Sequence, residues 1–572
     1  MILDKKWVIK PKGDTATVTN LCKAINVSEN IGRLLVQRGI TGFDEAKKFF
    51  RPNLTDLHDP FLLKDMDKAV MRIIKGVSTN EKILIFGDYD VDGTSSVAMV
   101  YSFFKNELGY TQCAYYIPDR YKEGYGVSKA GIDFAVDNDF TLIICLDCGI
   151  KSVDLIHDAK NRGVDFIVCD HHLPGKILPE AVAILNAKQT DCKYPYKELC
   201  GCGVGFKLLQ GLSQRMGLPA QDVFGYIDFV AIATCCDIVP LTGENRVFVA
   251  EGLKVLNTRP RLGIKKMLEL ANKKPPLCVE DIVFVIGPRI NAAGRIKHGS
   301  GAVELFMASA TDPLANDYAE ILQTSNKERQ ELDKSITIEA LTIIDSDVVL
   351  QQKKSNVLFK SNWHKGVVGI VASRVLERYY KPTIILTESN GMATGSARSI
   401  KGFDVHKAIE NCSDLLENFG GHMFAAGLTM KLEHVETFQQ KFEETVNEML
   451  NGIMPVQEIE IDEEIDLSRV SQKFYDIIRQ LAPFGPANMD PVFLCKNVIA
   501  LDGTRIVGDT HLKLVIAPAN QPEHAFKAIA FKMAHFLPYI NSGQPFSIVF
   551  NLRENEWMGN RSVELDIKDI KL

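Results

Sequence analysis

Residues 83–96 read Ile83-Leu84-Ile85-Phe86-Gly87-Asp88-Tyr89-Asp90-Val91-Asp92-Gly93-Thr94-Ser95-Ser96. The Ile-rich apolar run that opens this stretch predicts a short buried strand. Three carboxylates follow at a spacing of two residues, which places them on one side of the chain if it stays extended. The small residues that come next predict a helix start, and an amphipathic run from Val97 to Leu108 continues it. The order is therefore strand, acidic turn and helix.

Three acids this close together repel one another unless a cation holds them. Oxygen-rich ligand sets suit Mg²⁺ or Mn²⁺. A solvated acidic turn could carry the same residues, but a third acid placed directly after a buried strand favours a metal site. We therefore expect Asp88, Asp90 and Asp92 to bind a divalent cation.

The composition describes an ordinary globular protein, because 46% of the 572 residues are hydrophobic and 24% are charged. A chain of this length is too long to fold around one hydrophobic core, so we expect three or four domains. A net charge of −6 means that nucleic-acid binding would need local basic surfaces. The sequence has no apolar run near the ~20 residues of a membrane span and no signal-peptide core at its start. Thirteen cysteines, an odd number, favour reduced thiols, so we expect a cytoplasmic protein without membrane contact.

Strands and helices alternate from Ile83 onward, which predicts an α/β fold with a mainly parallel sheet covered by helices on both faces. The predicted strands are 83–87, 112–117, 141–146, 165–169 and 181–185. Ligands of such sheets bind outside the carboxyl ends of the strands. Four of these ends deliver polar residues to one edge: the three acids above, then Arg120, then Asp147, then Asp170-His171-His172.

Each of these groups also has an ordinary structural explanation. Asp147 could cap a helix that begins near Lys151, and Asp170 could cap a helix beside two surface histidines. A further acid, Asp237, follows the apolar residues 229–236 and could close a helix, although an acid in so apolar a setting usually has a partner. Convergence on one sheet edge favours a shared site.

These residues, in their order and spacing, resemble the motifs of the DHH phosphoesterase superfamily. The matching segments are 86–93, 118–126, 146–149, 169–172, 237–240, 287–295, 363–370 and 420–427, so the resemblance spans roughly residues 80 to 430. It is closest to the bacterial members that degrade single-stranded DNA from its 5′ end.

The resemblance implies a parallel-sheet DHH catalytic domain at 61–300 behind an N-terminal cap region at 1–60. A long charged run without Gly predicts a linking helix, which we assign to 301–345. A second, smaller α/β domain, the DHH-associated domain, is expected at 346–452. Short β-rich segments predict a small barrel at 453–572, where the resemblance implies an OB-fold.

Carboxylates and histidines without a dedicated cysteine quartet indicate two hard divalent ions, Mn²⁺ or Mg²⁺. By resemblance the ligands are Asp88, Asp90, Asp92, Asp147, His171 and Asp237. Asp147 would bridge the two ions, and Asp90 and Asp147 would take part in catalysis. His172 would lie near the scissile phosphate as a hydrogen-bond donor or general acid. The assignment of each acid to each ion stays open.

An enzyme that starts at a 5′ end needs an anion pocket, which arginine side chains and backbone N–H groups supply best. The candidates, all in the matched motifs, are Arg120, Arg289, Asn291, Arg295, Ser396 (or Ser399), Arg398 and His422.

The function that these expectations imply is a metal-dependent 5′→3′ exonuclease, a monomer, that degrades single-stranded DNA to 5′-mononucleotides in recombination and repair. The superfamily resemblance also implies a helicase and a single-strand-binding protein as partners. Two alternatives stay open: a phosphodiesterase for short oligoribonucleotides or cyclic dinucleotides, and a scaffold that binds single strands without cutting. No G-x-x-x-x-G-K-[ST] motif occurs, so ATP-driven unwinding is unsupported. Cysteines 192, 200, 202, 235 and 236 could gather around zinc, although packing is the simpler explanation.

Overall fold

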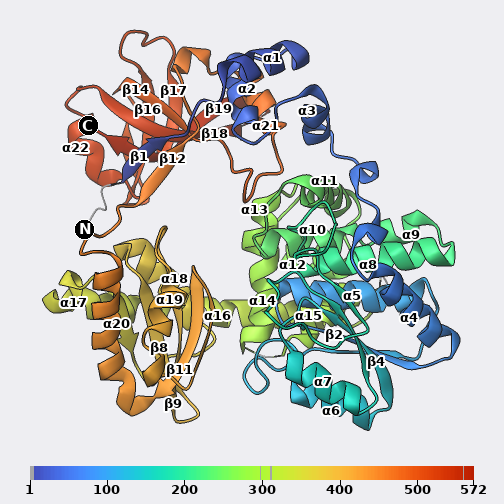
Figure 1. Ribbon diagram of the computed structural model, residues 1–572. Helices are drawn as coiled ribbons and strands as arrows, with labels where there is room; N and C mark the ends of the chain where they lie inside the picture. The colour runs from blue at the N-terminus through green and yellow to red at the C-terminus, as the bar shows by residue number, and fades with distance from the viewer. Residues whose placement is uncertain (1–4, 297, 310–311, 558) are drawn as a thin grey trace.

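The computed structural model describes residues 5–296, 298–309, 312–557 and 559–572. Its larger sheets lie in three parts of the molecule, and each has its own hydrophobic core (Figure 1). Among the described residues, no helix combines the length and the apolar character that crossing a membrane would require.

The first sheet is parallel throughout and has the strand order β3-β2-β4-β5-β6. Its strands are β2 (Lys82–Gly87), β3 (Cys113–Tyr116), β4 (Phe140–Leu146), β5 (Asp165–Cys169) and β6 (Ala183–Leu185). This order confirms the predicted fold class. The chain runs from β2 to β3 on one side and then returns to β4 on the other, so the switch point lies between β2 and β4. Ligands of open parallel sheets bind at such a point.

The central strands β2 and β4 are apolar except for Lys82 and Thr141 near their starts, as expected where helices cover both faces of a sheet. Ile83 and Ile85 pack in the core beneath α4 (Met66–Ser78), α5 (Val91–Asn106) and α8 (Gly201–Met216). Leu84 and Phe86 point the other way, into the core beneath α6 (Lys129–Asp137) and α7 (Val153–Asn161).

The chain does not stay extended through the three acids, so the premise of the spacing argument was wrong. Asp90 is the N-cap of α5 and accepts a 3.0 Å hydrogen bond from the backbone N–H of Gly93. Helix α5 therefore begins at Val91, and Asp92 lies in its first turn, where the helix dipole favours a negative charge. Gly93 has to be glycine, because a Cβ there would lie 2.3 Å from the carbonyl oxygen of Asp88.

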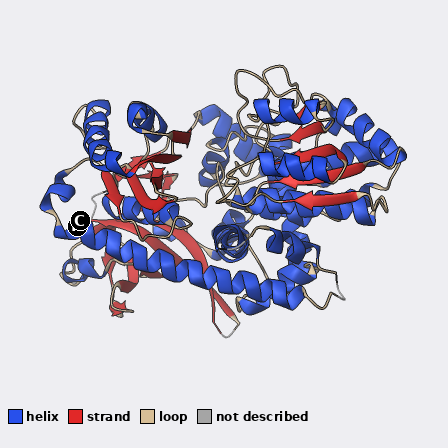
Figure 2. Cartoon of the chain, turned by 90° about the horizontal axis from the view of Figure 1, so that it is seen from below, coloured by secondary structure: helices blue, strands red, loops and turns tan. Residues whose placement is uncertain are grey.

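The second sheet, β10-β11-β9-β8-β7, belongs to a smaller α/β part of the chain. Its strands are β7 (Asn356–Phe359), β8 (Thr383–Ser389), β9 (Met392–Arg398), β10 (Asn418–His422) and β11 (Ala425–Lys431), and α18 (Val368–Tyr379) and α20 (Val435–Met449) pack on it. Helix α16 (Ala315–Ser346) joins this part to the catalytic sheet and is the long helix of Figure 2. A separate helix, α15 (Ser300–Met307), packs in the catalytic core instead.

The C-terminal part is a closed barrel. Strands run in the order β14-β18-β19-β17-β16, and a further pairing of β16 with β14 closes the circle. They are β14 (Phe493–Ala500), β16 (His511–Pro518), β17 (Phe526–Ala530), β18 (Phe546–Trp557) and β19 (Asn560–Lys571). Closure removes the exposed edges that an open sheet would present.

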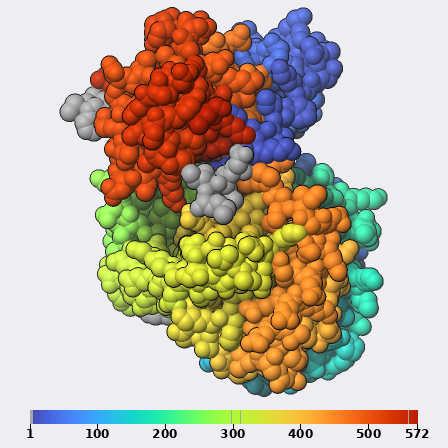
Figure 3. Space-filling model, turned by 90° about the vertical axis from the view of Figure 1, so that its left-hand side faces the viewer, coloured from blue at the N-terminus to red at the C-terminus, as the bar shows by residue number. Residues whose placement is uncertain are grey.

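The N-terminal region packs on this barrel. Strand β1 (Lys6–Ile9), which the sequence pattern did not predict, pairs in parallel with β12 (Glu458–Ile461). Helices α1 (Thr15–Ile25), α2 (Glu29–Val36) and α3 (Phe43–Phe50) place apolar side chains in the barrel's core. Figure 3 shows the blue N-terminal residues beside the orange and red C-terminal ones. The two ends of the chain therefore fold as one unit.

This shared core predicts that an N-terminal substitution destabilises the C-terminal barrel. Leu34 is 0% exposed and belongs to the same core as Phe493 and Leu514. We expect Leu34→Ala to lower the free energy of unfolding by about 2–5 kcal/mol, because it removes buried methyl groups and leaves a cavity. Proteolysis in urea, with the fragments mapped by mass spectrometry, measures this. Leu62→Ala, at a side chain that is 44% exposed, is the control. A barrel that resists protease equally in both variants would contradict the shared core.

Candidate active site

The candidate active site lies at the carboxyl ends of the parallel strands. Asp88 follows β2, Asp147 follows β4, and His171 and His172 follow β5. Asp237 joins them from the C-terminus of α10 (Ile227–Cys236). At Asp147 the backbone is left-handed, with φ 61°, and its N–H donates to the carbonyl oxygen of Cys169 on the neighbouring strand. Such conformations are costly for a residue with a side chain and concentrate at functional sites.

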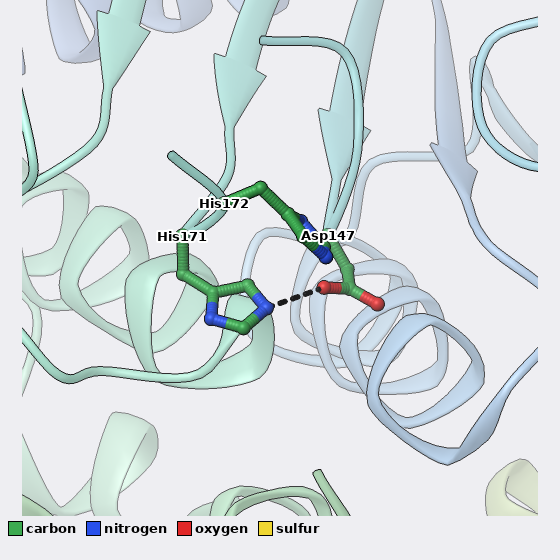
Figure 4. Close-up of side chains that lie close together, drawn as sticks. All are labelled: Asp147, His171 and His172. Atoms are coloured by element: carbon green, nitrogen blue, oxygen red, sulfur yellow. Dashed lines mark ion pairs between the residues drawn. The ribbon is translucent and has the colours of Figure 1, made fainter. Parts of the chain in front are cut away.

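His171 is the centre of this group. Its Nε2 lies 3.2 Å from Asp147 Oδ1 (Figure 4). The same nitrogen lies 3.5 Å from Asp237 Oδ2 and 3.9 Å from Asp92 Oδ2. Two sets of potential metal ligands share it. We call Asp147, His171 and His172 the first ligand group, and Asp92, His171 and Asp237 the second ligand group.

The site is buried, and burial determines its charge state. Burial and then the neighbouring acids raise the pKa of Asp88, Asp147 and Asp237 well above the usual range. The same causes raise the pKa of Asp92 to about 7. Burial, followed by the charge of His172, lowers the pKa of His171 to about 3. The His171 ring is therefore neutral at pH 7, so its contact with Asp147 is no ion pair. Neutral imidazole is the form that binds metal ions.

Several buried polar atoms of this site have no hydrogen-bond partner within the described part of the chain. They are Asp88 Oδ2, Asp147 Oδ1, both ring nitrogens of His171, and Asp237 Oδ2. A buried polar atom without a partner costs roughly 1–3 kcal/mol. Divalent cations would give the carboxylate oxygens and one ring nitrogen of His171 a partner, and carboxylate oxygens with imidazole nitrogen suit Mn²⁺ and Mg²⁺. The residues therefore fit the expected metal ions.

Asp92 is held by the N-terminus of α8. Its two carboxylate oxygens accept hydrogen bonds from the backbone N–H groups of Gly201 (2.6 Å) and Cys202 (2.7 Å). Gly201 also packs against the site, since a Cβ there would lie 2.5 Å from Asp147 Cβ. The sequence analysis did not select this turn, although its alternation of glycine and cysteine at 200–203 was visible. The cysteines pack in the core, and none of the described cysteines belongs to a candidate metal group.

His172 has a carboxylate partner that the sequence analysis did not select. Its Nδ1 lies 2.7 Å from Asp170 Oδ1, and Asp170 also accepts hydrogen bonds from the backbone N–H groups of Ile150 and His172. Burial would raise the pKa of Asp170, but the hydrogen bond and charge of His172 hold it at about 2. Burial would likewise lower the pKa of His172, but Asp170 outweighs it and raises that pKa. The pair fixes the orientation of the ring.

Tyr125 is a second residue that the pattern did not single out. Its hydroxyl donates to the carbonyl oxygen of Asp147 at 2.9 Å and lies 3.3 Å from both ring nitrogens of His172. Asp90 differs from the other acids because its carboxylate caps α5 and belongs to neither ligand group. Its role as a ligand stays a prediction.

Three of the predicted anion-binding residues form what we call the arginine cluster: Arg120, Arg295 and Arg398. Burial, and then the charge of Arg120, lowers the pKa of Arg295 to about 10 and also lowers the pKa of Arg398. Within the described residues, none of the three is ion-paired with a carboxylate. Arg295 donates to the carbonyl oxygen of Gly366 at 2.9 Å, and Arg398 donates to Ser396 Oγ at 2.8 Å. The cluster therefore holds positive charge without a carboxylate ion pair among the described residues, which favours an anionic ligand.

The cluster contains residues of both α/β parts. Arg295 belongs to α14 (Gly287–Ile296), and Arg398 and Ser396 belong to β9. Gly366 packs closely here, since a Cβ would lie 2.5 Å from the Tyr121 hydroxyl and 2.7 Å from the carbonyl oxygen of Arg295. Lys365 was not among the predicted site residues. Its Nζ lies 5.9 Å from the centroid of the Tyr121 ring. Burial and then Arg120 lower its pKa.

The remaining anion-binding candidates lie around this cluster. The pKa of His422, at the end of β10, is lowered by burial, then by the charge of Arg398 and then by that of His172. Arg289 donates to Gln323 Oε1 (2.8 Å) and to the carbonyl oxygen of Val285 (2.6 Å). Asn291 is half-buried on the same helix, α14. The Ser399 hydroxyl donates to the carbonyl oxygen of Phe403, so Ser396 is the better candidate for donating a hydroxyl hydrogen bond to an anion.

Comparisons with known proteins agree with this geometry. The DHH family, N-terminal domain, matches residues 82–234, the DHHA1 domain matches 350–448, and the RecJ OB domain matches 461–569. The chain is 36% identical to the single-stranded-DNA-specific exonuclease RecJ of Bacillus subtilis, over 99% of this chain and 70% of that protein. It is 32% identical to the RecJ of Escherichia coli, over 94% of this chain and 95% of that protein.

Among solved structures, the chain is similar to RecJ from Thermus thermophilus in complex with Mn²⁺. The TM-score is 0.84 at 26% sequence identity, over 99% of this chain and 79% of that one. It is also similar to an exonuclease RecJ bound to manganese, with a TM-score of 0.59 at 30% identity, over 69% of this chain and 96% of that one.

The close approach of Gly201 to Asp147 predicts that a single added methyl group disturbs the metal site. We expect Gly201→Ala to weaken Mn²⁺ binding by about 10–100-fold, because the residues that orient ligands affect metal affinity by this amount. Electron paramagnetic resonance of a Mn²⁺ titration measures it. Gly203→Ala in the same turn is the matched control, since its Cβ would meet nothing closer than 3.5 Å. Equal Mn²⁺ affinities of the two variants would refute the role assigned to Gly201.

The raised pKa values predict an unusual pH dependence for the metal-free protein. Buried carboxyls that stay protonated in the fold, but ionise at a pKa of ~3.9 when unfolded, stabilise the fold fully at low pH. This stability is lost as the pH rises through the folded pKa, which is about 7 for Asp92 and higher than usual for Asp88, Asp147 and Asp237. In EDTA we expect the melting temperature to fall as the pH rises from about 5 to about 7, between the unfolded and the folded pKa of Asp92, because the four carboxyls outweigh the opposite contribution of His171.

Excess Mn²⁺ should reverse this trend, because the ion binds deprotonated carboxylates and stabilises the fold by about 2.7 kcal/mol at 100 times its Kd. Differential scanning calorimetry measures both curves. A melting temperature that is flat or rising with pH in EDTA would show that the carboxyls are ionised without metal.

Proposed function

The chain belongs to the RecJ family of single-stranded-DNA-specific exonucleases, and from this membership we propose that it removes 5′-mononucleotides from the 5′ end of single-stranded DNA. The observation that carries the proposal is that two sites of opposite charge lie in the same part of the molecule. A buried group of acids around His171 has polar atoms without partners, and in the described part of the chain the arginine cluster forms no ion pair with a carboxylate.

Two divalent ions, when bound, would supply an activated water and neutralise the charge of the phosphodiester. The residues that would hold them are Asp88, Asp90, Asp92, Asp147, His171 and Asp237, and His172 of the first ligand group is left free to act on the phosphodiester. The protein's own contribution is orientation. Gly201 and Cys202 fix Asp92 through two backbone N–H groups, and burial keeps His171 neutral and ready to bind.

His172 is the residue that we propose acts on the phosphodiester itself. Asp170 bonds its Nδ1 and raises its pKa, so the ring keeps a proton to higher pH than an ordinary histidine. The side chain is 42% exposed, in contrast to the 9% of His171. It can therefore donate a hydrogen bond or a proton to the phosphate or the leaving oxygen, which is the expected role of a positioned general acid.

We propose that the arginine cluster, Ser396 and His422 bind the terminal 5′ phosphate, with Arg289 and Asn291 next to them along the strand. Arginine binds phosphate oxygens through paired N–H groups. A site closed around the terminal phosphate favours an end over an internal position, and so favours exonuclease over endonuclease action. The barrel would hold the strand further from the end, as OB-folds do through basic grooves and aromatic side chains.

We further propose a division into an N-terminal cap region (1–60), a catalytic domain (61–300), a linking helix (301–345), a substrate-binding domain (346–452) and a barrel domain (453–572). The protein would act as a monomer in the cytoplasm, in DNA recombination and repair. Because it has no nucleotide-hydrolysis motif, a helicase would have to open duplex ends. A single-strand-binding protein would cover the exposed strand.

The test is hydrolysis of a 5′-phosphorylated single-stranded DNA oligomer with Mn²⁺ or Mg²⁺, beside matched duplex DNA and RNA. We expect mononucleotides to appear from the 5′ end of the single strand alone, and Asp147→Asn to abolish them. Arg398→Ala should raise KM for the phosphorylated oligomer about 10–100-fold, since hydrogen bonds to charged groups contribute roughly 1.5–3 kcal/mol each. It should have little effect on a 5′-hydroxyl oligomer.

Arg378→Ala is the matched control for this experiment, because Arg378 is exposed on α18. Hydrolysis of short RNA or a cyclic dinucleotide in place of single-stranded DNA would contradict the proposed substrate and leave the metal site standing. Binding of the oligomer without hydrolysis of any substrate would contradict the enzymatic function.

A further inference from the structure

A loop of the C-terminal part contacts the chain just after the metal-site residue Asp237. This loop, residues 482–489, lies before the barrel strand β14, and we call it the docking loop. The backbone N–H of Leu241 donates to the carbonyl oxygen of Pro486 at 2.8 Å. Leu241 is fully buried and lies only four positions after Asp237.

The docking loop also packs closely against the catalytic part at residues on either side of Pro486. A Cβ on Gly485 would lie 2.5 Å from Leu241 Cδ1, so any larger residue would have to displace the buried Leu241 side chain. Arg246, on α11 (Gly243–Thr258), donates to the carbonyl oxygens of Ala482 (2.7 Å) and Pro483 (3.3 Å). Its side chain is buried, with the guanidinium 3.8 Å from the ring centroid of Phe49. A buried guanidinium costs free energy unless carbonyl groups satisfy it, so this contact is specific.

The docking loop is itself held in one shape. Asn488 is buried and donates to the carbonyl oxygens of Leu481 and Pro483, both at 2.9 Å. Its Oδ1 accepts a 2.9 Å hydrogen bond from Arg38 of the N-terminal region. Gly485 and Asn488 also pair through their backbones. The loop is therefore bonded to the N-terminal region on one side and to the catalytic part on the other, so its position depends on both.

The segment that the loop holds is strained next to Asp237. Ile238 has φ 61°, a left-handed conformation that is unfavourable for a β-branched residue, and its side chain is 69% exposed. Such a conformation persists only where its surroundings impose it. The restraints lie two and three residues further on: the carbonyl oxygen of Pro240 accepts from Tyr196 Oη (3.1 Å) and Asn245 Nδ2 (3.0 Å), and Leu241 is held by the docking loop.

We propose that the docking loop is a positioning element for Asp237, so that the C-terminal part completes the second ligand group in addition to holding DNA. The first ligand group does not need it, because Asp147, His171 and His172 follow β4 and β5 directly. Gly485 and Arg246 are positioning residues in this sense. The proposal rests on the proposed function only for its activity readout, and its metal-binding readout is independent.

Linkage makes the coupling reciprocal. If docking of the loop improves cation binding at Asp237, cation binding must stabilise docking by the same factor. Mn²⁺ should therefore slow hydrogen exchange in residues 482–489 of the wild-type protein, although these residues contact no metal ligand directly.

The test compares Gly485→Ala and Arg246→Lys with the control Met489→Ala, whose side chain is 62% exposed at the end of the same loop. The readouts are a Mn²⁺ titration followed by electron paramagnetic resonance, hydrogen exchange of residues 238–241, and hydrolysis of a 5′-phosphorylated dinucleotide and a long oligomer. For both variants we expect one Mn²⁺ site to weaken about 10–100-fold, as for other residues that orient ligands. Exchange should become faster, and kcat should fall on both substrates.

Wild-type Mn²⁺ affinity in both variants, with KM raised only for the long oligomer, would overturn the proposal, because the loop would then only attach a DNA-binding domain. If Gly485→Ala fails to fold by circular dichroism, Arg246→Lys decides alone, since it keeps the charge and the volume. A wild-type protein that hydrolyses neither substrate would refute the proposed function, while loss of a Mn²⁺ site in the variants would still support the positioning role.

Discussion

The structure depends on one electrostatic constraint, which is the burial of several carboxyl groups around a single neutral histidine. Neither Coulomb repulsion nor desolvation permits Asp88, Asp92, Asp147 and Asp237 to be ionised together without a cation. The surrounding architecture makes the arrangement possible. Parallel strands bring Asp88 and Asp147 to one edge, and the N-terminus of α8 supplies N–H groups to Asp92. The glycines at 93 and 201 give the space that side chains would fill.

A second concentration of charge, of opposite sign, complements this one. The arginine cluster is formed by α14 and β9, so it requires the two α/β parts to meet, and the close approach of Gly366 to Tyr121 shows how closely they do. The charges of both Arg398 and His172, after burial, lower the pKa of His422, so this residue is electrostatically coupled to both regions. Under the proposed function, a polyanion whose end phosphate neutralises the arginines would be directed toward the acids, where the cations would neutralise the next phosphodiester. The positions of the two charged regions would then select the bond that is hydrolysed.

Much of the fold was predictable because its strongest signals are local. The five strands of the catalytic sheet are short apolar runs that end in polar residues, and these patterns identified them without long-range information. The path through Asp90 and Asp92 was predicted wrongly, because a period of two was assumed where a capping carboxylate starts a helix instead. Asp170 and Tyr125 were not selected as site residues. Both lie in matched motifs, but their roles depend on contacts that only the fold shows: Asp170 with the ring of His172, and Tyr125 with the carbonyl oxygen of Asp147.

By itself the sequence determined the chemistry of the site: which residue types stand at the strand ends, and therefore that a hard divalent cation and an anionic substrate fit. Periodicity and motif spacing are properties of neighbouring residues, so they are present before the chain folds. Only the tertiary structure decided that both ligand groups contain His171, that α8 holds the carboxylate of Asp92, and how the barrel meets the segment after Asp237. Those facts arise from packing between segments as distant as Leu241 and Pro486 or Leu34 and Phe493, and no local pattern encodes a distance across that separation.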